Sequence, residues 1–375
     1  MKVILAGDFC DSARVSGIIE RNQYETLFAS VRDIIKSVDF SFVNFEFPVV
    51  AKEGKPIPKC GPNLKGQPKA VDAIKYAGFN CCTLANNHIL DQGEECLKDT
   101  KSRIEAVGIK TVGAGSNLTE ASEILYLHKD GQKLAVINCC EHEFTIAMDT
   151  RAGANPLNPI QQFYKIQEAR QNADYVLVIV HGGHEHYQLP SPRMKETYRF
   201  FVDAGADAVV NHHQHCYSGY EVYNGKPIFY GIGNFLFDWE NERDSMWNEG
   251  YMVELTFEKN RIKYELIPYS QGNEDVGVTV MTDITNFNAT INKLNRIIAD
   301  DVQLSITWLD FTAKNRSFYN PALVPYRSRI FSKLYRMNLL PSFVSKAQLQ
   351  FIYAVVNCES HRDCFLNFLD NKINN

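Results

Sequence analysis

Short apolar runs alternate with amphipathic segments through about the first 270 residues of the chain. Runs rich in branched and aromatic side chains are typical of strands, and apolar residues at helical spacing are typical of helices, so the alternation predicts an α/β fold. One run, residues 175–180, is apolar throughout and predicts a buried central strand. We expect strands at residues 3–6, 40–47, 81–84, 125–128, 133–137, 175–180, 208–210, 220–223, 228–230, 251–257 and 261–267, and helices at 25–37, 68–77, 94–106, 159–173 and 192–204, with a loop before the first helix.

Three pairs of these strands are separated only by short turns. The separating dipeptides are Asp-Gly at 130–131, Asn-Gly at 224–225 and Lys-Asn at 259–260. Asp-Gly and Asn-Gly favour the tight hairpin turns that need a positive φ at both central positions. We therefore expect antiparallel pairs within the fold, which makes the sheets mixed.

Beyond about residue 275 the strand pattern fades, and residues 285–298 and 328–370 have the spacing of helices. We expect a first domain over residues 1–270 and a mainly helical extension over 271–375 that packs on it. Residues 326–336 are basic and amphipathic. Such a segment either packs on the main domain with its basic face in solvent or contacts a membrane or a partner.

Composition and charge exclude several classes of protein. A net charge of -5 and a pI near 6.1 give no basic surface for nucleic acid. The first residues lack the apolar core of a signal peptide, and no run approaches the roughly 20 apolar residues of a membrane span. Adjacent cysteines at 81–82 and 139–140 lie within expected strands, where they fit small apolar positions. We expect a reduced, cytoplasmic protein without a transmembrane segment.

Five of the apolar runs end in side chains that bind metals or catalyse reactions. A histidine at one strand end is usually structural, but ligands of open α/β sheets bind at the carboxyl ends of the strands, so five such clusters favour a shared site. Carboxylates with imidazoles suit manganese, iron or zinc, and a pair of such ions activates water for hydrolysis. The clusters are Asp8; Asn44 and Glu46; Asn86, Asn87 and His88; His181, His184 and Glu185; and Asn211, His212, His213 and His215.

These clusters belong to an ordered set of motifs: Gly7-Asp8, Asn44-Phe45-Glu46, Ala85-Asn86-Asn87-His88 with Asp91 and Gly93, His181-Gly182-Gly183-His184-Glu185, Asp203-Ala204-Gly205-Ala206-Asp207, His213-Gln214-His215 and Tyr230-Gly231-Ile232-Gly233-Asn234-Phe235. With this set the chain resembles the CapA-type (PGA_cap) branch of the calcineurin-like metallophosphoesterase superfamily, which is associated with bacterial capsule and poly-γ-glutamate synthesis. The resemblance spans residues 1 to about 257. It implies a four-layer αββα sandwich with mixed sheets, followed here by the helical extension.

The resemblance also implies a set of roles at two divalent metal ions, manganese, iron or zinc. Asp8 and His215 would hold one ion, and Glu46 would bridge both. The second ion would be held by His181, His213 and Asn87. His88 would donate a proton to the leaving group or stabilise charge, with Asp91 as a structural or orienting partner. Two alternatives stay open: Asp8 as a loop cap, and Asn44 as a support for the turn at Glu46.

Glu46 stands where classical members have a bridging aspartate, a difference that CapA-type relatives share. Beyond this, the chain departs from the expected pattern at two positions. Cys10 stands where classical members have a histidine, and is either a thiolate ligand or a buried structural thiol. Gly182 stands where CapA-like proteins usually have tryptophan, which leaves either a wider pocket or a gap filled from elsewhere. Residues that could contact substrate or orient the ligands are Cys10, Asn44, His184, Glu185 and Asn234, whereas His186 and His212 are expected to be bystanders.

The leading hypothesis is a metal-dependent hydrolase, of phosphoesterase type, that acts on a phosphorylated or polymeric cell-surface precursor. One alternative is amide or glycan hydrolysis on a capsule polymer by the same water-activating site. Another is a non-catalytic subunit of a polymer-synthesis complex that docks through the C-terminal helices. Because we expect no membrane anchor, the protein would either work in the cytoplasm or be recruited to the membrane periphery by its extension.

Overall fold

The computed structural model describes residues 1–259, 261–315, 319, 328–337, 339–341 and 343–374. The chain divides into two compact units, Met1–Ser305 and Ile306–Asn375. The first unit therefore continues past residue 270, where the sequence suggested a boundary, because helix α9 (Thr285–Ala299) belongs to it. Packing of an extension on the first unit stays a prediction.

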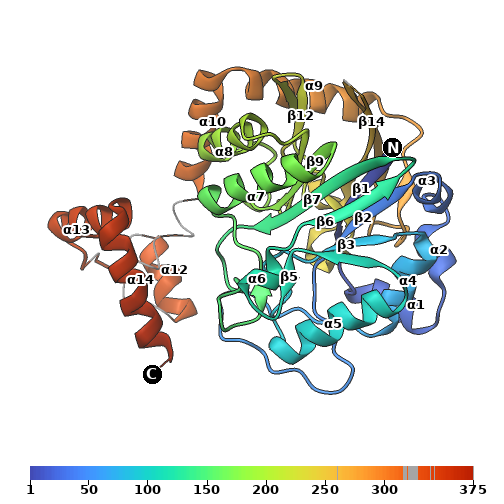
Figure 1. Ribbon diagram of the computed structural model, residues 1–375. Helices are drawn as coiled ribbons and strands as arrows, with labels where there is room; N and C mark the ends of the chain where they lie inside the picture. The colour runs from blue at the N-terminus through green and yellow to red at the C-terminus, as the bar shows by residue number, and fades with distance from the viewer. Residues whose placement is uncertain (260, 316–318, 320–327, 338, 342, 375) are drawn as a thin grey trace. The chain divides into compact units, whose positions relative to one another are not determined.

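The larger of the two main sheets has eight strands (Figure 1). Its centre is parallel. Strand β1 pairs in parallel with β2 and β13, β2 pairs in parallel with β3, and β3 pairs in parallel with β4. Antiparallel strands β14, β15 and β16 extend it on the other side of β1. The strands are β1 (Lys2–Phe9), β2 (Phe40–Phe45), β3 (Cys81–Thr83), β4 (Lys110–Val112), β13 (Asn234–Leu236), β14 (Glu249–Glu258), β15 (Arg261–Ser270) and β16 (Thr279–Val280).

The smaller main sheet has six strands in the order β11-β12-β10-β9-β7-β6. It is mixed as predicted, because β7, β9, β10 and β12 are parallel while the hairpin strands β6 and β11 are antiparallel to their neighbours. A short two-stranded sheet joins β5 (Ala114–Gly115) to β8 (Gly153–Ala154). The strands of the smaller sheet are β6 (Leu125–Lys129), β7 (Gln132–Cys140), β9 (Tyr175–His181), β10 (Ala208–His212), β11 (Tyr220–Tyr223) and β12 (Lys226–Phe229).

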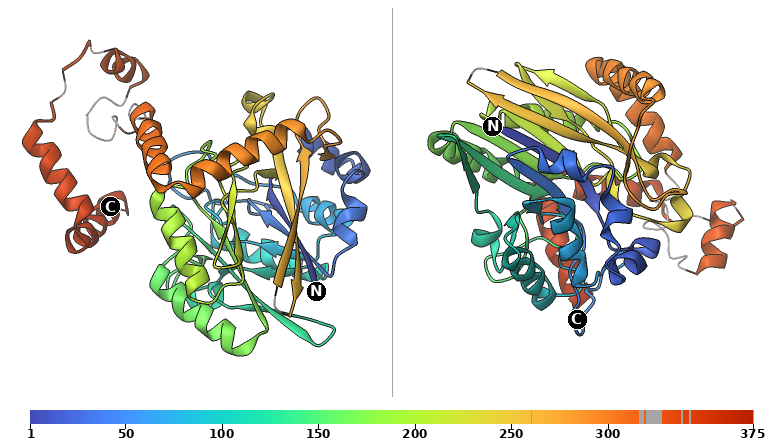
Figure 2. Two further views of the ribbon diagram at one scale, coloured as in Figure 1. Left: turned by 90° about the horizontal axis from the view of Figure 1, so that it is seen from above. Right: turned by 90° about the vertical axis from the view of Figure 1, so that its right-hand side faces the viewer.

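The two main sheets pack face to face between layers of helices (Figures 1 and 2). Tyr175 and Phe257 join them with ring centroids 5.1 Å apart, and Phe229 and Tyr264 with centroids 5.5 Å apart. The predicted four-layer sandwich is confirmed. The helices of the first unit are α1 (Ala13–Glu20), α2 (Tyr24–Phe28), α3 (Arg32–Lys36), α4 (Lys69–Ala77), α5 (Glu94–Ala106), α6 (Leu118–Ala121), α7 (Pro159–Asn172), α8 (Pro192–Asp203) and α9, and α10 (Asp301–Lys314) crosses the division between the units.

The first helical region differs from the prediction. The expected loop contains α1, whose first turn is held by a distant residue: the backbone N–H of Arg14 donates to Asp238 Oδ2 over 3.0 Å. The single helix expected at 25–37 is two helices, because the carbonyl of Leu27 accepts a hydrogen bond from Val278 N (2.9 Å) and Val31 N turns to the carbonyl of Phe28 instead. Both differences arise from contacts with segments far along the chain.

The second unit is helical as expected. Beyond the end of α10, the described part of this unit contains α12 (Arg329–Arg336), α13 (Lys346–Asn357) and α14 (Glu359–Asn374). The basic stretch predicted at 326–336 begins outside the described residues, but α12 covers most of it. Within the described part of the chain, no helix is both long enough and apolar enough to cross a bilayer.

Parallel pairing brings the functional strand ends together. Strands β1, β2 and β3 run in one direction in the larger sheet, and β9 and β10 do so in the smaller sheet, so their carboxyl ends lie at common edges. Gly7 allows β1 to approach the turn at Gly233, since a Cβ at position 7 would overlap the carbonyl oxygen of Gly233. This close approach sets Asp8 beside Asn234.

Candidate metal centre

The polar side chains predicted to form a site meet at the strand ends. Asp8 lies near the end of β1, and Glu46 directly follows β2. His181 is the last residue of β9, while His213 and His215 follow β10. All five are buried, with at most 4% of any of them exposed. A buried group of carboxylates and imidazoles needs compensating partners, because unpaired charge is costly away from water.

One potential set of metal donors combines Glu46, His181 and His213. His181 Nε2 lies 3.0 Å from His213 Nδ1 and 3.5 Å from Glu46 Oε1. The side-chain oxygen of Asn87 is 3.0 Å from the same His181 nitrogen. Burial and the neighbouring His213 hold the pKa of His181 well below its ordinary value, so its imidazole is neutral and offers a lone pair to a cation.

A second potential set combines Asp8, Glu46 and His215. His215 Nδ1 lies 2.8 Å from Asn234 Oδ1, which suits a donated hydrogen bond that leaves Nε2 unprotonated. That Nε2 is 3.8 Å from Glu46 Oε1. Asn234, predicted to orient ligands, thus contacts His215. We call the first set the imidazole-rich group and the second the carboxylate-rich group.

Glu46 belongs to both groups. Its side chain is fully buried, and among the described residues neither carboxylate oxygen has a hydrogen-bond partner. Burial, followed by the nearby charge of Asp8, raises the pKa of Glu46 well above its ordinary value. A divalent cation in each group would supply the missing partner for this carboxylate, so the residues fit a two-metal centre.

Asp8 is held firmly by protein donors. Asn44 Nδ2 donates to its Oδ1 over 2.7 Å, and the backbone N–H of His213 donates to its Oδ2 over 3.2 Å. His212 Nδ1 lies 3.1 Å from Oδ1, so His212, which was expected to be a bystander, contacts a predicted metal ligand. Burial acts to raise the pKa of Asp8, but the hydrogen bond with His212 and the neighbouring imidazoles outweigh it and hold that pKa below its ordinary value.

The backbone after β10 turns two imidazoles into the centre. His213 and His215 have φ angles of 89° and 55°, in the left-handed region that residues with a Cβ seldom adopt. Strained residues of this kind are concentrated at functional sites, where the surrounding structure holds them in place. Besides its contact with Asp8, Asn44 lies close to His181: Nδ2 of Asn44 is 3.3 Å from Nδ1 of His181.

His88 lies beside the centre in a buried chain of charged groups. Its Nδ1 is 2.6 Å from Asp91 Oδ2, which agrees with an orienting role for Asp91. Lys59 forms an ion pair with the other Asp91 oxygen, and its Nζ is 3.1 Å from His88 Nδ1. Burial lowers the pKa of His88, with a further lowering by Lys59, although the contact with Asp91 opposes both.

The sequence did not point to Lys59. It lies in the proline-rich connection between β2 and α4, and a connection of this composition predicts a surface loop. Its side chain is nevertheless only 1% exposed. A lysine is seldom buried unless it has a partner, and here the partner, Asp91, follows 32 positions later in the chain. Only the fold brings the two together.

Asn86 serves the turn rather than the metal groups. Its Nδ2 donates to Asn44 Oδ1 (3.1 Å) and to the carbonyl of Phe45 (3.0 Å), while its Oδ1 accepts from the backbone N–H of His88 (3.1 Å). The side chain therefore ties the end of β2 to the loop that carries Asn87 and His88.

The two departures from the superfamily pattern receive structural answers. Cys10 is buried in the apolar core of the larger sheet, and burial, followed by the charge of Glu46, raises the pKa of its thiol well above the ordinary value. This favours the structural thiol over the thiolate ligand. At Gly182, a Cβ would lie 2.7 Å from Glu141 Cγ, so the gap is filled from elsewhere, by Glu141. Glu141 also accepts a hydrogen bond from Gly183 N (3.0 Å) and pairs with Arg193.

Residues 184–186 lie toward the rim of the site. His184 Nδ1 is 2.9 Å from the carbonyl oxygen of Glu185, a local contact within the loop after β9. Glu185 and His186 are exposed, and the His186 ring stacks on Trp247 with centroids 5.7 Å apart. Roles of His184 and Glu185 in contacting substrate stay predictions.

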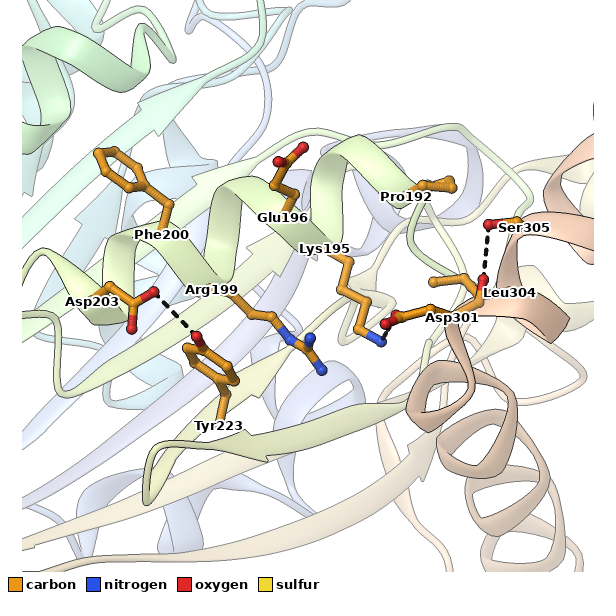
Figure 3. A pocket seen from close by; sticks show the side chains of 10 residues that line it. All are labelled: Pro192, Lys195, Glu196, Arg199, Phe200, Asp203, Tyr223, Asp301, Leu304 and Ser305. Atoms are coloured by element: carbon orange, nitrogen blue, oxygen red, sulfur yellow. Dashed lines mark hydrogen bonds and ion pairs between the residues drawn. The ribbon is translucent and has the colours of Figure 1, made fainter.

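A separate cavity of about 450 Å³ lies along α8, on the helical layer of the smaller sheet (Figure 3). Its two inward cations already have partners: Lys195 Nζ is 2.6 Å from Asp301 Oδ1, and Arg199 pairs with Glu221. Asp203 also faces it, hydrogen-bonded to Tyr223 (3.1 Å). Because both of its cations are already paired, this cavity is a weaker candidate for ligand binding than the candidate metal centre.

Comparison with known proteins identifies the family. The family described as bacterial capsule synthesis protein PGA_cap matches residues 2–239. The chain belongs to the PGA_cap family. The PGA biosynthesis protein CapA of Bacillus subtilis is 31% identical over 268 residues, which cover 70% of this chain and 69% of that protein. The capsule biosynthesis protein CapA of Bacillus anthracis is 33% identical over 255 residues, 65% of this chain, and the match spans only 62% of its length.

Solved structures similar to this PGA_cap chain include two enzymes. A phosphatase from Mycoplasma pneumoniae aligns with a TM-score of 0.44 at 15% identity, covering 72% of this chain and 92% of that one. A 5'-nucleotidase from Candida albicans aligns with a TM-score of 0.42 at 12% identity, covering 84% of this chain and 58% of that one.

Proposed function

We propose that this PGA_cap protein is a metal-dependent hydrolase of phosphoesterase type that acts on a phosphorylated cell-surface precursor. The observation that carries the proposal is Glu46, a buried carboxylate without hydrogen-bond partners among the described residues, shared by two groups of metal donors. Family membership supports the link to surface-polymer synthesis. The imidazole and carboxylate donors support manganese, iron or zinc as the ions.

Two bound divalent ions would supply an activated water and a positive charge for the oxygens of the substrate. The chain's own residues prepare the rest of the site. Asn44 and His212 orient Asp8, and Asn234 orients His215. Asp91 contacts Nδ1 of His88, so Nε2 is the nitrogen left to face a substrate. An anionic substrate group would raise the lowered pKa of His88 again, because opposite charge favours the protonated imidazole.

The test loads purified protein in turn with manganese, iron and zinc, measures bound metal by elemental analysis, and screens phosphomonoesters and phosphodiesters. We expect turnover in at least one metal state. His88→Ala should lower kcat by roughly 10²- to 10⁴-fold without changing metal content, as loss of an acid–base group does. The exposed His128→Ala is the matched control and should behave as wild type.

Two results would contradict the proposal. One is the absence of phosphoester turnover in every metal state. The other is an unchanged rate in His88→Ala, which would assign any turnover to another site. Product analysis on poly-γ-glutamate and on capsule glycan then distinguishes amide or glycan hydrolysis from a non-catalytic role in a polymer-synthesis complex.

A further inference from the structure

Charge is divided unevenly between the two units. Residues 306–375 contain nine lysines and arginines against four aspartates and glutamates, although the whole chain has 39 basic and 44 acidic residues. Between Asp310 and Glu359 the chain has seven basic residues and no acidic one. Such a run attracts anionic surfaces. The second unit therefore differs in electrostatic character from the unit that holds the metal centre.

Helix α12 combines this charge with an apolar face. Arg329, Lys333 and Arg336 are spaced i, i+4 and i+7, so they share one side of the helix, and all three are exposed. Ile330 and Phe331 lie away from that basic side and are 71% and 52% exposed. A short helix with basic and apolar faces of this kind is typical of segments that lie in the interface of a membrane.

Large exposed apolar residues also follow α12 along the chain. Met337, Leu339 and Phe343, on the segment that leads to α13, are 58%, 63% and 66% exposed. On α13 itself, Phe351 and Tyr353 are 70% and 71% exposed. Single exposed apolar residues are ordinary, but a series of large ones marks an interaction surface.

We propose that α12, with the exposed apolar residues Met337, Leu339 and Phe343 beyond it, docks on an anionic lipid bilayer. Ile330 and Phe331 would enter the interface while Arg329, Lys333 and Arg336 contact the headgroups. A lipid surface is favoured over a protein groove because the exposed apolar residues lie on irregular backbone as well as on helices, and a fluid surface accepts them without a matching shape. The three exposed basic residues of α12 supply the charge complementarity. The proposal does not depend on hydrolase activity.

Sedimentation of the full chain with vesicles tests the proposal. Wild type should bind mixed phosphatidylcholine–phosphatidylglycerol vesicles, bind pure phosphatidylcholine vesicles much more weakly, and lose affinity as salt is raised. Each basic residue near an anionic surface is worth about a fivefold gain in affinity, so R329Q/K333Q/R336Q should bind mixed vesicles roughly 100-fold more weakly. I330S/F331S should also lose binding, although it keeps every charge.

The matched control is K98Q/K129Q/K263Q, which removes the same charge from exposed positions of the first unit and should bind as wild type. Thermal unfolding checks that every variant is folded. The proposal is wrong if wild type does not bind mixed vesicles, binds both vesicle types equally, or loses no affinity in either tail variant. It is also wrong if wild type binds no vesicles and I330S/F331S instead changes its oligomeric state, which would assign the face to contacts between copies.

Discussion

The two donor groups of the candidate metal centre share Glu46 but differ in their other members. The imidazole-rich group adds His181 and His213, whereas the carboxylate-rich group adds Asp8 and His215. Imidazole donors favour zinc and iron, and oxygen donors favour harder ions such as manganese. One shared carboxylate therefore joins two positions, and we expect these positions to prefer different ions.

The groups also differ in how firmly the protein holds their carboxylates. Asp8 receives hydrogen bonds from Asn44 and from the backbone of His213, and His212 contacts it as well. Glu46 has no such partner among the described residues. Asp8 is therefore oriented by the protein itself, whereas Glu46 would gain its stabilisation from the proposed ions.

The largest expected effect distinguishes the two groups directly. We expect His181→Ala to abolish tight zinc binding while leaving more of the manganese binding, and His215→Ala to do the reverse. Each loss should exceed the roughly 10- to 100-fold that follows removal of an outer partner of a ligand. Elemental analysis after dialysis measures both, with His128→Ala as the control. Equal loss of both ions in both variants would mean that the groups are not distinct in preference.

A smaller effect is expected at His212. Because its Nδ1 contacts Asp8 Oδ1, His212→Phe should weaken ion binding at the carboxylate-rich group by roughly 10- to 100-fold and leave the imidazole-rich group occupied. Titration with manganese and zinc, followed by calorimetry, measures each affinity. Exposed His186→Phe is the matched control. Unchanged manganese affinity in His212→Phe would mean that His212 plays no part in ion binding.

The third prediction concerns Glu46 without metal. Because its pKa is raised by burial, the folded metal-free protein keeps a proton that the unfolded chain releases above about pH 4.3, so its stability falls as the pH rises beyond that value. Glutamine does not titrate. We expect Glu46→Gln to raise the free energy of unfolding of the metal-free protein by about 2 kcal/mol at neutral to alkaline pH and by less in acid.

Urea unfolding of chelator-treated protein at several pH values measures this difference. The exposed Glu95→Gln removes a carboxylate without burial and should change little. A less stable Glu46→Gln variant, or a gain that does not grow with pH, would mean that Glu46 is already compensated in the metal-free protein.

The smallest effect is expected at Lys59, outside both donor groups. Lys59→Met should leave metal content unchanged and lower kcat by about tenfold, less than loss of His88 itself, because Lys59 acts only through Asp91. Lys59→Arg should retain more activity than Lys59→Met, and the exposed Lys52→Met should retain all of it. Loss of bound metal in Lys59→Met would instead mean that the loop carrying Lys59 supports metal binding.

Much of the architecture was predictable because local patterns carry it. The apolar run ending at His181, the Asp-Gly and Asn-Gly turns, and the proline start of α8 each act over a few residues, and the structure contains the strand, hairpins and helix they predict. The donors at the strand ends were also visible, since parallel pairing brings carboxyl ends to one edge whatever the details of packing.

Contacts between distant segments decided the rest. Helix α1 begins where it does because Asp238 accepts the N–H of Arg14, 224 positions away in the chain, and no local pattern reveals this acceptor. Lys59 beside Asp91 likewise depends on how a long loop folds back over the site.

The sequence by itself determined which residue types stand at the strand ends, and with them the chemistry available to this protein. Tertiary structure decided how they are used: His212 turns toward Asp8, Glu141 fills the space beside Gly182, and Glu46 is left without a hydrogen-bond donor among the described residues. The physical reason is that hydrogen-bond satisfaction and burial depend on every neighbour in space, whereas a sequence pattern records only neighbours along the chain.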